Sequence, residues 1–109
     1  MMAQNFRRYT SNSVSTTPTT IFTADSNDTI IGISIANVAS TQVNATVTIT
    51  VGSDVISIVN SAPIPVGSSL QVLDGGAKLV MQSGDILKVT SSVTSGLDVW
   101  VSAVDAIST

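Results

Sequence analysis

Oxygen-bearing side chains carry nearly all of the chemistry that this sequence could perform. Serine, threonine and seven aspartates are present, whereas histidine, cysteine and glutamate are absent. The absent residues are those that most often move protons near neutral pH, bind transition metals or act as activated thiols. A serine nucleophile needs a positioned base, and the remaining candidates are Lys78 and Lys88. Both lie in predicted strands, and we interpret them as solvent-facing residues that protect a sheet edge. We therefore predict that the protein is not an enzyme.

The aspartates are better explained by turns than by a catalytic or metal site. Most follow or precede Gly, Ser or Asn, where an Asp side chain bonds its own backbone. A carboxylate pair for glycoside hydrolysis stays an alternative, although four aromatic residues offer little to hold a sugar ring. The Asp25-Ser26-Asn27-Asp28 segment offers oxygens to calcium, but that ion takes about six to eight ligands. A capped turn is favoured, and we predict no metal and no cofactor.

Length and charge restrict the classes of partner. A chain of 109 residues corresponds to one domain. Charged residues make up 10% of it, against roughly 25% in an average soluble domain. Four basic residues and a net charge of −3 argue against a nucleic-acid partner, which needs several cations to neutralise phosphates. No apolar run approaches the roughly 20 residues that span a bilayer, so we expect no membrane partner, and no apolar segment of a secretory signal follows Arg7 and Arg8.

The hydrophobic pattern predicts an all-β fold. Ser, Thr, Val and Ile make up more than half of the chain, and β-branched side chains favour a pleated surface. Alternation with a period of two indicates about eight strands. The predicted strands are residues 19–23, 29–38, 42–51, 55–60, 69–73, 78–82, 86–91 and 97–107. We predict a single β-sandwich of antiparallel strands, jelly-roll-like, with an N-terminal arm.

Within these strands the pattern also predicts which side chains face the core. Val47 lies on the apolar face of the most regular strand, and Thr48 lies on the opposite face. In residues 29–38 we place Ile31, Ile33 and Ile35 together on one face. Hairpins are expected at Gly52-Ser53-Asp54 and at Asp74-Gly75-Gly76. The prolines at 63 and 65 are expected to interrupt the sheet, because proline cannot donate to a central ladder.

The N-terminal segment differs from the rest. We divide the chain into an arm, residues 1–15, and a β-sandwich domain, residues 16–109. The arm holds Phe6, Arg7, Arg8 and Tyr9, whereas the remainder has two lysines against seven aspartates, a balance of −5. A frayed terminus and an arm that docks on a neighbouring subunit explain it equally well. We expect the domain to fold after deletion of residues 1–12, with assembly impaired.

The one tryptophan, Trp100, lies between Val99 and Val101 in the last predicted strand. A core position is favoured, and the alternative is an anchor at a subunit interface, where tryptophan is enriched. The interface candidates are therefore Phe6, Arg7, Arg8, Tyr9 and Trp100.

Several segments, taken in order, resemble one family. They are Ile-Ile-Gly-Ile-Ser-Ile-Ala-Asn-Val at 30–38, Pro-Ile-Pro-Val-Gly-Ser-Ser-Leu at 63–70 and Lys-Leu-Val-Met-Gln-Ser-Gly-Asp-Ile-Leu-Lys-Val at 78–89, with residues 6–11 and 18–23 fitting as well. This pattern resembles small virion structural proteins of tailed bacteriophages, most like those of phages infecting cyanobacteria. None of the motifs is catalytic, and each is a strand with its turn.

The resemblance implies a non-enzymatic assembly component located in the virion. From this resemblance we first expect a capsid decoration, or cement, subunit that forms a homotrimer and binds the major capsid protein. A neck, tail or baseplate component is the nearest alternative. A carbohydrate-binding module for host adsorption is the runner-up from another class, although it calls for more aromatic residues than this chain has.

Overall fold

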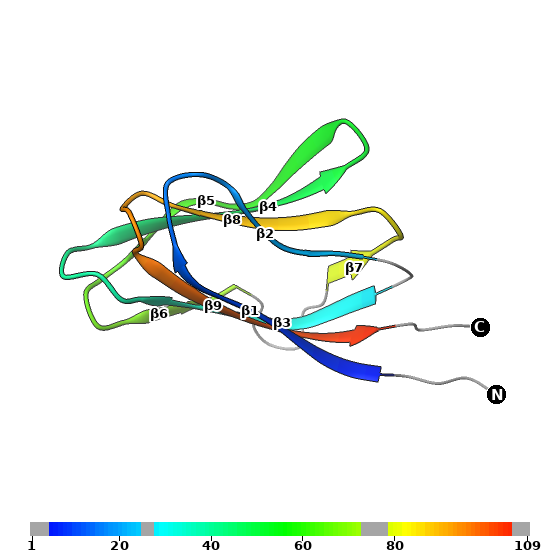
Figure 1. The fold of residues 1–109 in the computed structure, drawn as a ribbon, viewed down its shortest axis with the longest axis horizontal. Coiled ribbons are helices and arrows are strands. Elements are labelled where there is room, and N and C mark those ends of the chain that lie inside the picture. Colours follow the sequence, from blue (N-terminus) through cyan, green and yellow to red (C-terminus); the bar gives the residue numbers. More distant parts are fainter. Residues whose placement is uncertain (1–4, 25–27, 73–78, 106–109) are drawn as a thin grey trace.

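The computed structural model describes residues 5–24, 28–72 and 79–105, which form nine antiparallel strands (Figure 1). The strands are β1 (Asn5–Val14), β2 (Thr19–Thr23), β3 (Asp28–Asn37), β4 (Val43–Val51), β5 (Asp54–Ile64), β6 (Ser69–Gln71), β7 (Leu79–Met81), β8 (Ile86–Ser91) and β9 (Leu97–Asp105). Among the described residues no helix is long and apolar enough to cross a membrane. The turn predicted at Asp74-Gly75-Gly76 lies outside the described residues.

The strands form two sheets that pack face to face (Figure 1). The five-stranded sheet has the order β1-β9-β3-β6, with β7 pairing to the first residues of β3, and the four-stranded sheet has the order β2-β8-β4-β5. The chain is paired like one long folded hairpin: β1 with β9, β2 with β8, β3 with β6 and β7, and β4 with β5. This is the strand order of a jelly roll. The predicted β-sandwich is confirmed.

Alternating apolar residues build the core between the sheets. In β4, Val43, Ala45, Val47 and Ile49 are buried, while the intervening residues, from Asn44 to Thr50, are half-buried on the outer face. Each fully buried Val or Ile contributes roughly 1.5–3 kcal/mol through loss of apolar surface from water. The predicted inward orientation of Val47 is confirmed. Strands β2 and β8 have the predicted bounds.

One face assignment in β3 is wrong. Ile33 and Ile35 are buried as predicted, but Ile30 takes the third core position and Ile31 is 41% exposed. The pairing with β9 shifts register between Ile30 and Gly32, which lie opposite consecutive residues of β9. Ile31 is therefore the extra residue of a β-bulge, which inverts the alternation on one side of it.

The prediction that Pro63 interrupts the sheet is also wrong. Pro63 lies inside β5, opposite Asn44 of β4. Because β5 is an edge strand, a residue without an N–H is tolerated there. Two register shifts bend β5 against β4, and bulges of this kind hinder the addition of a further strand. The predicted hairpin before it is confirmed, with Gly52 at φ 61° in the turn.

The predicted arm is, over Asn5–Val14, an edge strand of the five-stranded sheet. Strand β1 pairs with β9 from Asn5, opposite Asp105, to Val14, opposite Leu97. Val14 is buried in the core. The segment therefore does not stand apart from the sandwich, and it supplies the ninth strand. Its irregular pattern has a cause in the fold, because a bulge between Ser11 and Val14 breaks the alternation.

Candidate binding surfaces

The ionisable side chains of the described residues are spread over the sandwich. Asp85 accepts a hydrogen bond from the Gln82 backbone N–H at 2.9 Å, which is the role expected of an aspartate in a turn. Asp28, from the segment weighed as a calcium loop, is a buried residue of β3, and residues 25–27 lie outside the described part. Within the described ranges no group of three or more acidic residues is placed to hold a metal ion.

Lys88 does not protect a sheet edge, contrary to the sequence interpretation. It lies in β8, an inner strand of the four-stranded sheet. Its register partners are Thr20 of β2 on one side and Thr48 of β4 on the other. It is half-buried on the outer face among threonines, which continue along that face. Lys78, the other lysine, lies outside the described residues.

Trp100 is exposed on the outer face of the five-stranded sheet, so the favoured core position is wrong. Its neighbours Val99 and Val101 are buried, whereas the Trp100 side chain is 51% exposed. The reason is the strand period of two, since Leu97, Val99, Val101 and Ala103 form the inward face of β9. The register partners of Trp100 are Thr10 of β1 and Ser34 of β3, both short side chains. The indole therefore stands above a surface of small residues.

Among the other interface candidates whose side chains are described, Arg8 contacts the tryptophan and Arg7 lines a hollow together with it. The Arg8 guanidinium carbon lies 5.6 Å from the centre of the Trp100 ring, within range of a cation–π contact. Tyr9 points the other way and packs against the core. Arg7 is exposed. Phe6 is paired through its backbone with Val104, and its side chain lies outside the described part of the structure.

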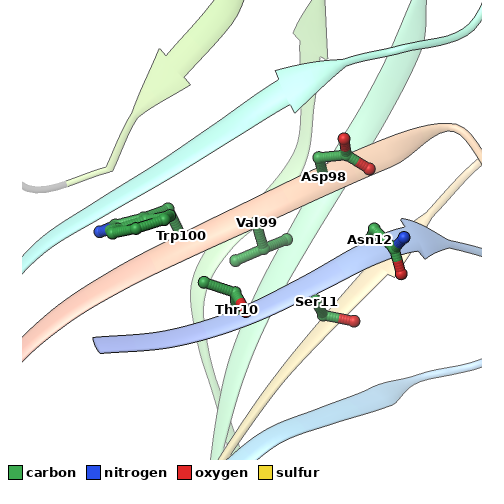
Figure 2. A pocket seen from close by; sticks show the side chains of 6 residues that line it. All are labelled: Thr10, Ser11, Asn12, Asp98, Val99 and Trp100. Atoms are coloured by element: carbon green, nitrogen blue, oxygen red, sulfur yellow. The ribbon is translucent and has the colours of Figure 1, made fainter. Parts of the chain in front are cut away.

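Two shallow hollows flank Trp100. The first has a volume of about 500 Å³ and is bounded by β1 and β9 (Figure 2). Its lining is polar apart from Val99 and the indole, and consists of Thr10, Ser11, Asn12, Asp98, Val99 and Trp100. The second, of about 440 Å³, is basic and apolar, with Arg7, Arg8 and Ile31 among its residues. Trp100 belongs to both, so the indole separates two chemically different halves of one face.

A bulge in β1 shapes the first hollow. Ser11 lies opposite Val99 and Val14 opposite Leu97, so that Asn12 and Ser13 together face Asp98. Ser13 has a φ of 55°, and its backbone N–H donates to Oδ1 of Asp98 at 2.9 Å. This hydrogen bond holds the carboxylate in the lining of the first hollow. It also occupies only one of the two carboxylate oxygens.

Exposed apolar side chains lie elsewhere, on both faces of the tip of the β4–β5 hairpin. We use the name hairpin tip for residues 51–56, which project beyond the body of the sandwich (Figure 1). Val51, Val55 and Ile56 are exposed there, Val55 to 64%. The hairpin belongs to the four-stranded sheet, whereas Trp100 lies on the outer face of the other sheet. The two surfaces are therefore on different layers of the molecule.

Sequence reasoning missed Asn12 and Asp98 as site residues. Asp98 could have been found, because the alternation Leu97, Val99, Val101 places it with Trp100 on the polar face of one strand. Asn12 could not, since its position depends on a bulge that no local pattern indicates.

Comparison with known proteins gives no match to a protein-family model, to a curated protein or to a solved structure.

Proposed function

We propose that this protein is a non-enzymatic structural subunit of a tailed-phage virion that attaches to the particle surface through its hairpin tip. Capsid decoration is the first location, with a neck, tail or baseplate position as the alternative. The resemblance of residues 30–38, 63–70 and 78–89 to small phage virion proteins supports the class of protein. Jelly rolls recur in viral capsid proteins, but they also host other functions, so the fold adds only an analogy.

The choice of the hairpin tip as the attachment surface rests on one observation. Val51, Val55 and Ile56 are exposed on a projecting hairpin. Exposed apolar side chains on both faces of a projecting hairpin favour a contact that encloses the hairpin between partners. The hairpin tip presents these side chains on a short β-ribbon, which can enter a groove between neighbouring lattice subunits. Asp54 is the one ionisable residue of the hairpin tip. Burial of this tip therefore removes apolar surface from water with little cost of desolvating charge.

The mechanism that follows is mechanical. A subunit that spans two lattice proteins binds their assembled state and not the separated proteins. Such binding stabilises the assembled state by mass action, in proportion to the logarithm of the concentration of subunit over its Kd. No bond is made or broken, which agrees with the absence of His, Cys and Glu from the chain.

The test uses particles of the phage that encodes this chain, prepared with its gene inactivated. Purified wild-type protein is expected to bind these particles and sediment with them. The double variant Val55→Lys, Ile56→Lys places two charges in the contact, and we expect its Kd to rise at least about tenfold, or 1.4 kcal/mol. Val66→Lys is the matched control, because Val66 is a similarly exposed valine, at 55%, in the β5–β6 connection. Image reconstruction of the decorated particle then gives the location.

Two results contradict the proposal. If antibodies against the protein detect none in purified wild-type particles, the virion assignment is wrong. If the double variant binds as well as wild type while Val66→Lys fails, the attachment surface lies at the opposite end of the sandwich.

A further inference from the structure

We propose that the first hollow beside Trp100 is a binding site for a neutral saccharide, a function separate from attachment through the hairpin tip. The occupant is inferred from the combination of a flat aromatic surface with hydroxyl, amide and carboxylate groups around one open depression (Figure 2). Its volume of about 500 Å³ falls within the range of small-molecule sites, roughly 300–1,000 Å³.

The indole supplies the platform. Trp100 is 51% exposed. The Arg8 guanidinium of the second hollow lies 5.6 Å from the ring centre, and the register partners Thr10 and Ser34 are too short to cover the rest of the ring. One face of a pyranose ring consists of C–H groups, which pack on an aromatic ring and remove apolar surface from water. The large ring also costs little conformational entropy on binding, because tryptophan has two side-chain torsions.

The polar groups around the hollow have hydrogen-bonding capacity left for sugar hydroxyls. Asp98 uses Oδ1 to accept from Ser13, which leaves Oδ2 available as a charged acceptor. Within the described residues, the side-chain amide of Asn12 and the side-chain hydroxyl of Thr10 make no hydrogen bond. A side-chain amide both donates and accepts hydrogen bonds, and a carboxylate accepts them. These groups therefore match the neighbouring hydroxyls of a sugar, each of which can donate and accept.

Charge decides between classes of saccharide. The carboxylate of Asp98 lines the first hollow and repels a uronic or sialic acid, whereas Arg7 and Arg8 line the second hollow. A hydroxyl that donates to a carboxylate forms a charge-assisted hydrogen bond, which is roughly twice as strong as a neutral one. The first hollow therefore favours a neutral sugar. The apolar hairpin tip offers no comparable polar groups, so the two surfaces differ in the partner that each fits.

One exposed platform gives a weak site. We expect a Kd of about 0.1–10 mM for a single trisaccharide. Many copies on a particle raise the avidity for a repeating surface glycan by several orders of magnitude without any new contact. Because the hairpin tip belongs to the other sheet, a subunit attached through it keeps the Trp100 face available.

The experiment is a two-dimensional NMR titration of the isolated protein with maltotriose, cellotriose, mannotriose and N,N′-diacetylchitobiose, and with trigalacturonate as the acidic probe. The chain has one tryptophan, so the single indole N–H signal reports directly on the site. We expect at least one neutral probe to shift it saturably, together with the backbone amides of Asn12 and Asp98.

Two variants test the contributions of the Trp100 indole and the Asp98 carboxylate to binding one at a time. Trp100→Ala, read through the Asn12 amide, and Asp98→Asn, which keeps an oxygen for the Ser13 N–H, are each expected to weaken binding at least about tenfold. Thr48→Ala, on the outer face of the other sheet, is the control and should bind as wild type.

Two outcomes overturn the proposal. The first is the absence of any shift with all neutral probes up to about 50 mM, well above the expected Kd. The second is preferential binding of trigalacturonate that Arg8→Gln abolishes, which would assign the ligand to the second hollow. Neither outcome bears on particle attachment, which the hairpin variants test separately.

Discussion

Tyr9 of β1 stacks on Phe22 of β2, with ring centroids 4.0 Å apart and planes inclined by 6°. Because β1 belongs to the five-stranded sheet and β2 to the four-stranded sheet, this pair joins the two layers along one side of the sandwich. Phe22 is buried, and Tyr9 packs against the core cluster. The aromatic pair of the N-terminal half thus closes the core between the first two strands.

A double-mutant cycle on this pair should measure the contact. Phe22→Ala is expected to lower the free energy of unfolding by about 3–5 kcal/mol, since it empties a buried site. The coupling between Tyr9→Ala and Phe22→Ala should be about 0.5–1.5 kcal/mol in urea unfolding. Thr10→Ala, an exposed neighbour in β1, is the control and should change stability by less than about 0.5 kcal/mol. Additive single effects would mean that the rings do not interact in solution.

Deletion of residues 1–12 should destabilise the protein. The expectation that the domain folds without them did not include β1 in the sheet. The deletion removes most of β1, leaves β9 as an unpaired edge and takes away Tyr9. We expect a lower Tm and aggregation, because a newly exposed edge strand pairs with other chains. Thermal unfolding and light scattering measure both effects. A truncated protein with the wild-type Tm would show that β1 contributes nothing to the fold.

Opposite faces of β4 should respond differently to a carboxylate. Val47 is 0% exposed, so Val47→Asp buries an unpaired charge at a cost of several kcal/mol and should prevent folding. Thr48→Asp places the charge on the outer face, opposite Lys88, where a cross-strand pair contributes roughly 0.2–1 kcal/mol. Circular dichroism and urea unfolding distinguish the two. Equal damage from both would contradict the orientation of this strand.

Two glycines should differ in their tolerance of a side chain. A Cβ at Gly96 would lie 2.9 Å from the Ser91 Oγ and 3.1 Å from the Val93 carbonyl oxygen, so Gly96→Ala should cost about 1–3 kcal/mol. A Cβ at Gly32 meets nothing within 4 Å, and Gly32→Ala should be neutral or stabilising by up to about 1 kcal/mol. Urea unfolding of the two glycine variants measures the change in the free energy of unfolding for each. A reversed order would contradict the packing around Gly96.

The isolated protein is expected to self-associate as a closed cyclic trimer. Charged residues make up 10% of the chain, and exposed valines and threonines cover much of its surface, so few like charges oppose association. Multi-angle light scattering at micromolar concentration and moderate salt should give the mass of three chains. A monomer throughout that range would contradict the prediction.

Local residue patterns were enough to predict the fold class and the inward face of the regular strands. In β4 the alternation of Val, Ala and Ile with Asn and Thr suffices, and in β8 Leu87 and Val89 alternate with Lys88 and Thr90, because side chains of a strand point to opposite faces with a period of two. Turn chemistry likewise determined the hairpin at Gly52, where a positive φ favours glycine. These features depend on residues close together in the chain.

Tertiary structure alone decided which strands are neighbours, where the bulges lie and which surfaces stay open. Ile31 is exposed because β3 gains a residue against β9, and Pro63 is tolerated because β5 is an edge. Likewise, Asn12 lines the same hollow as Trp100 only because a bulge in β1 faces Asp98. Each outcome depends on the register between strands that are distant in the chain, and local propensity does not encode that register. The position of Trp100 lies between these cases, since alternation indicates its face but only the packed sandwich shows that the side chain stays 51% exposed.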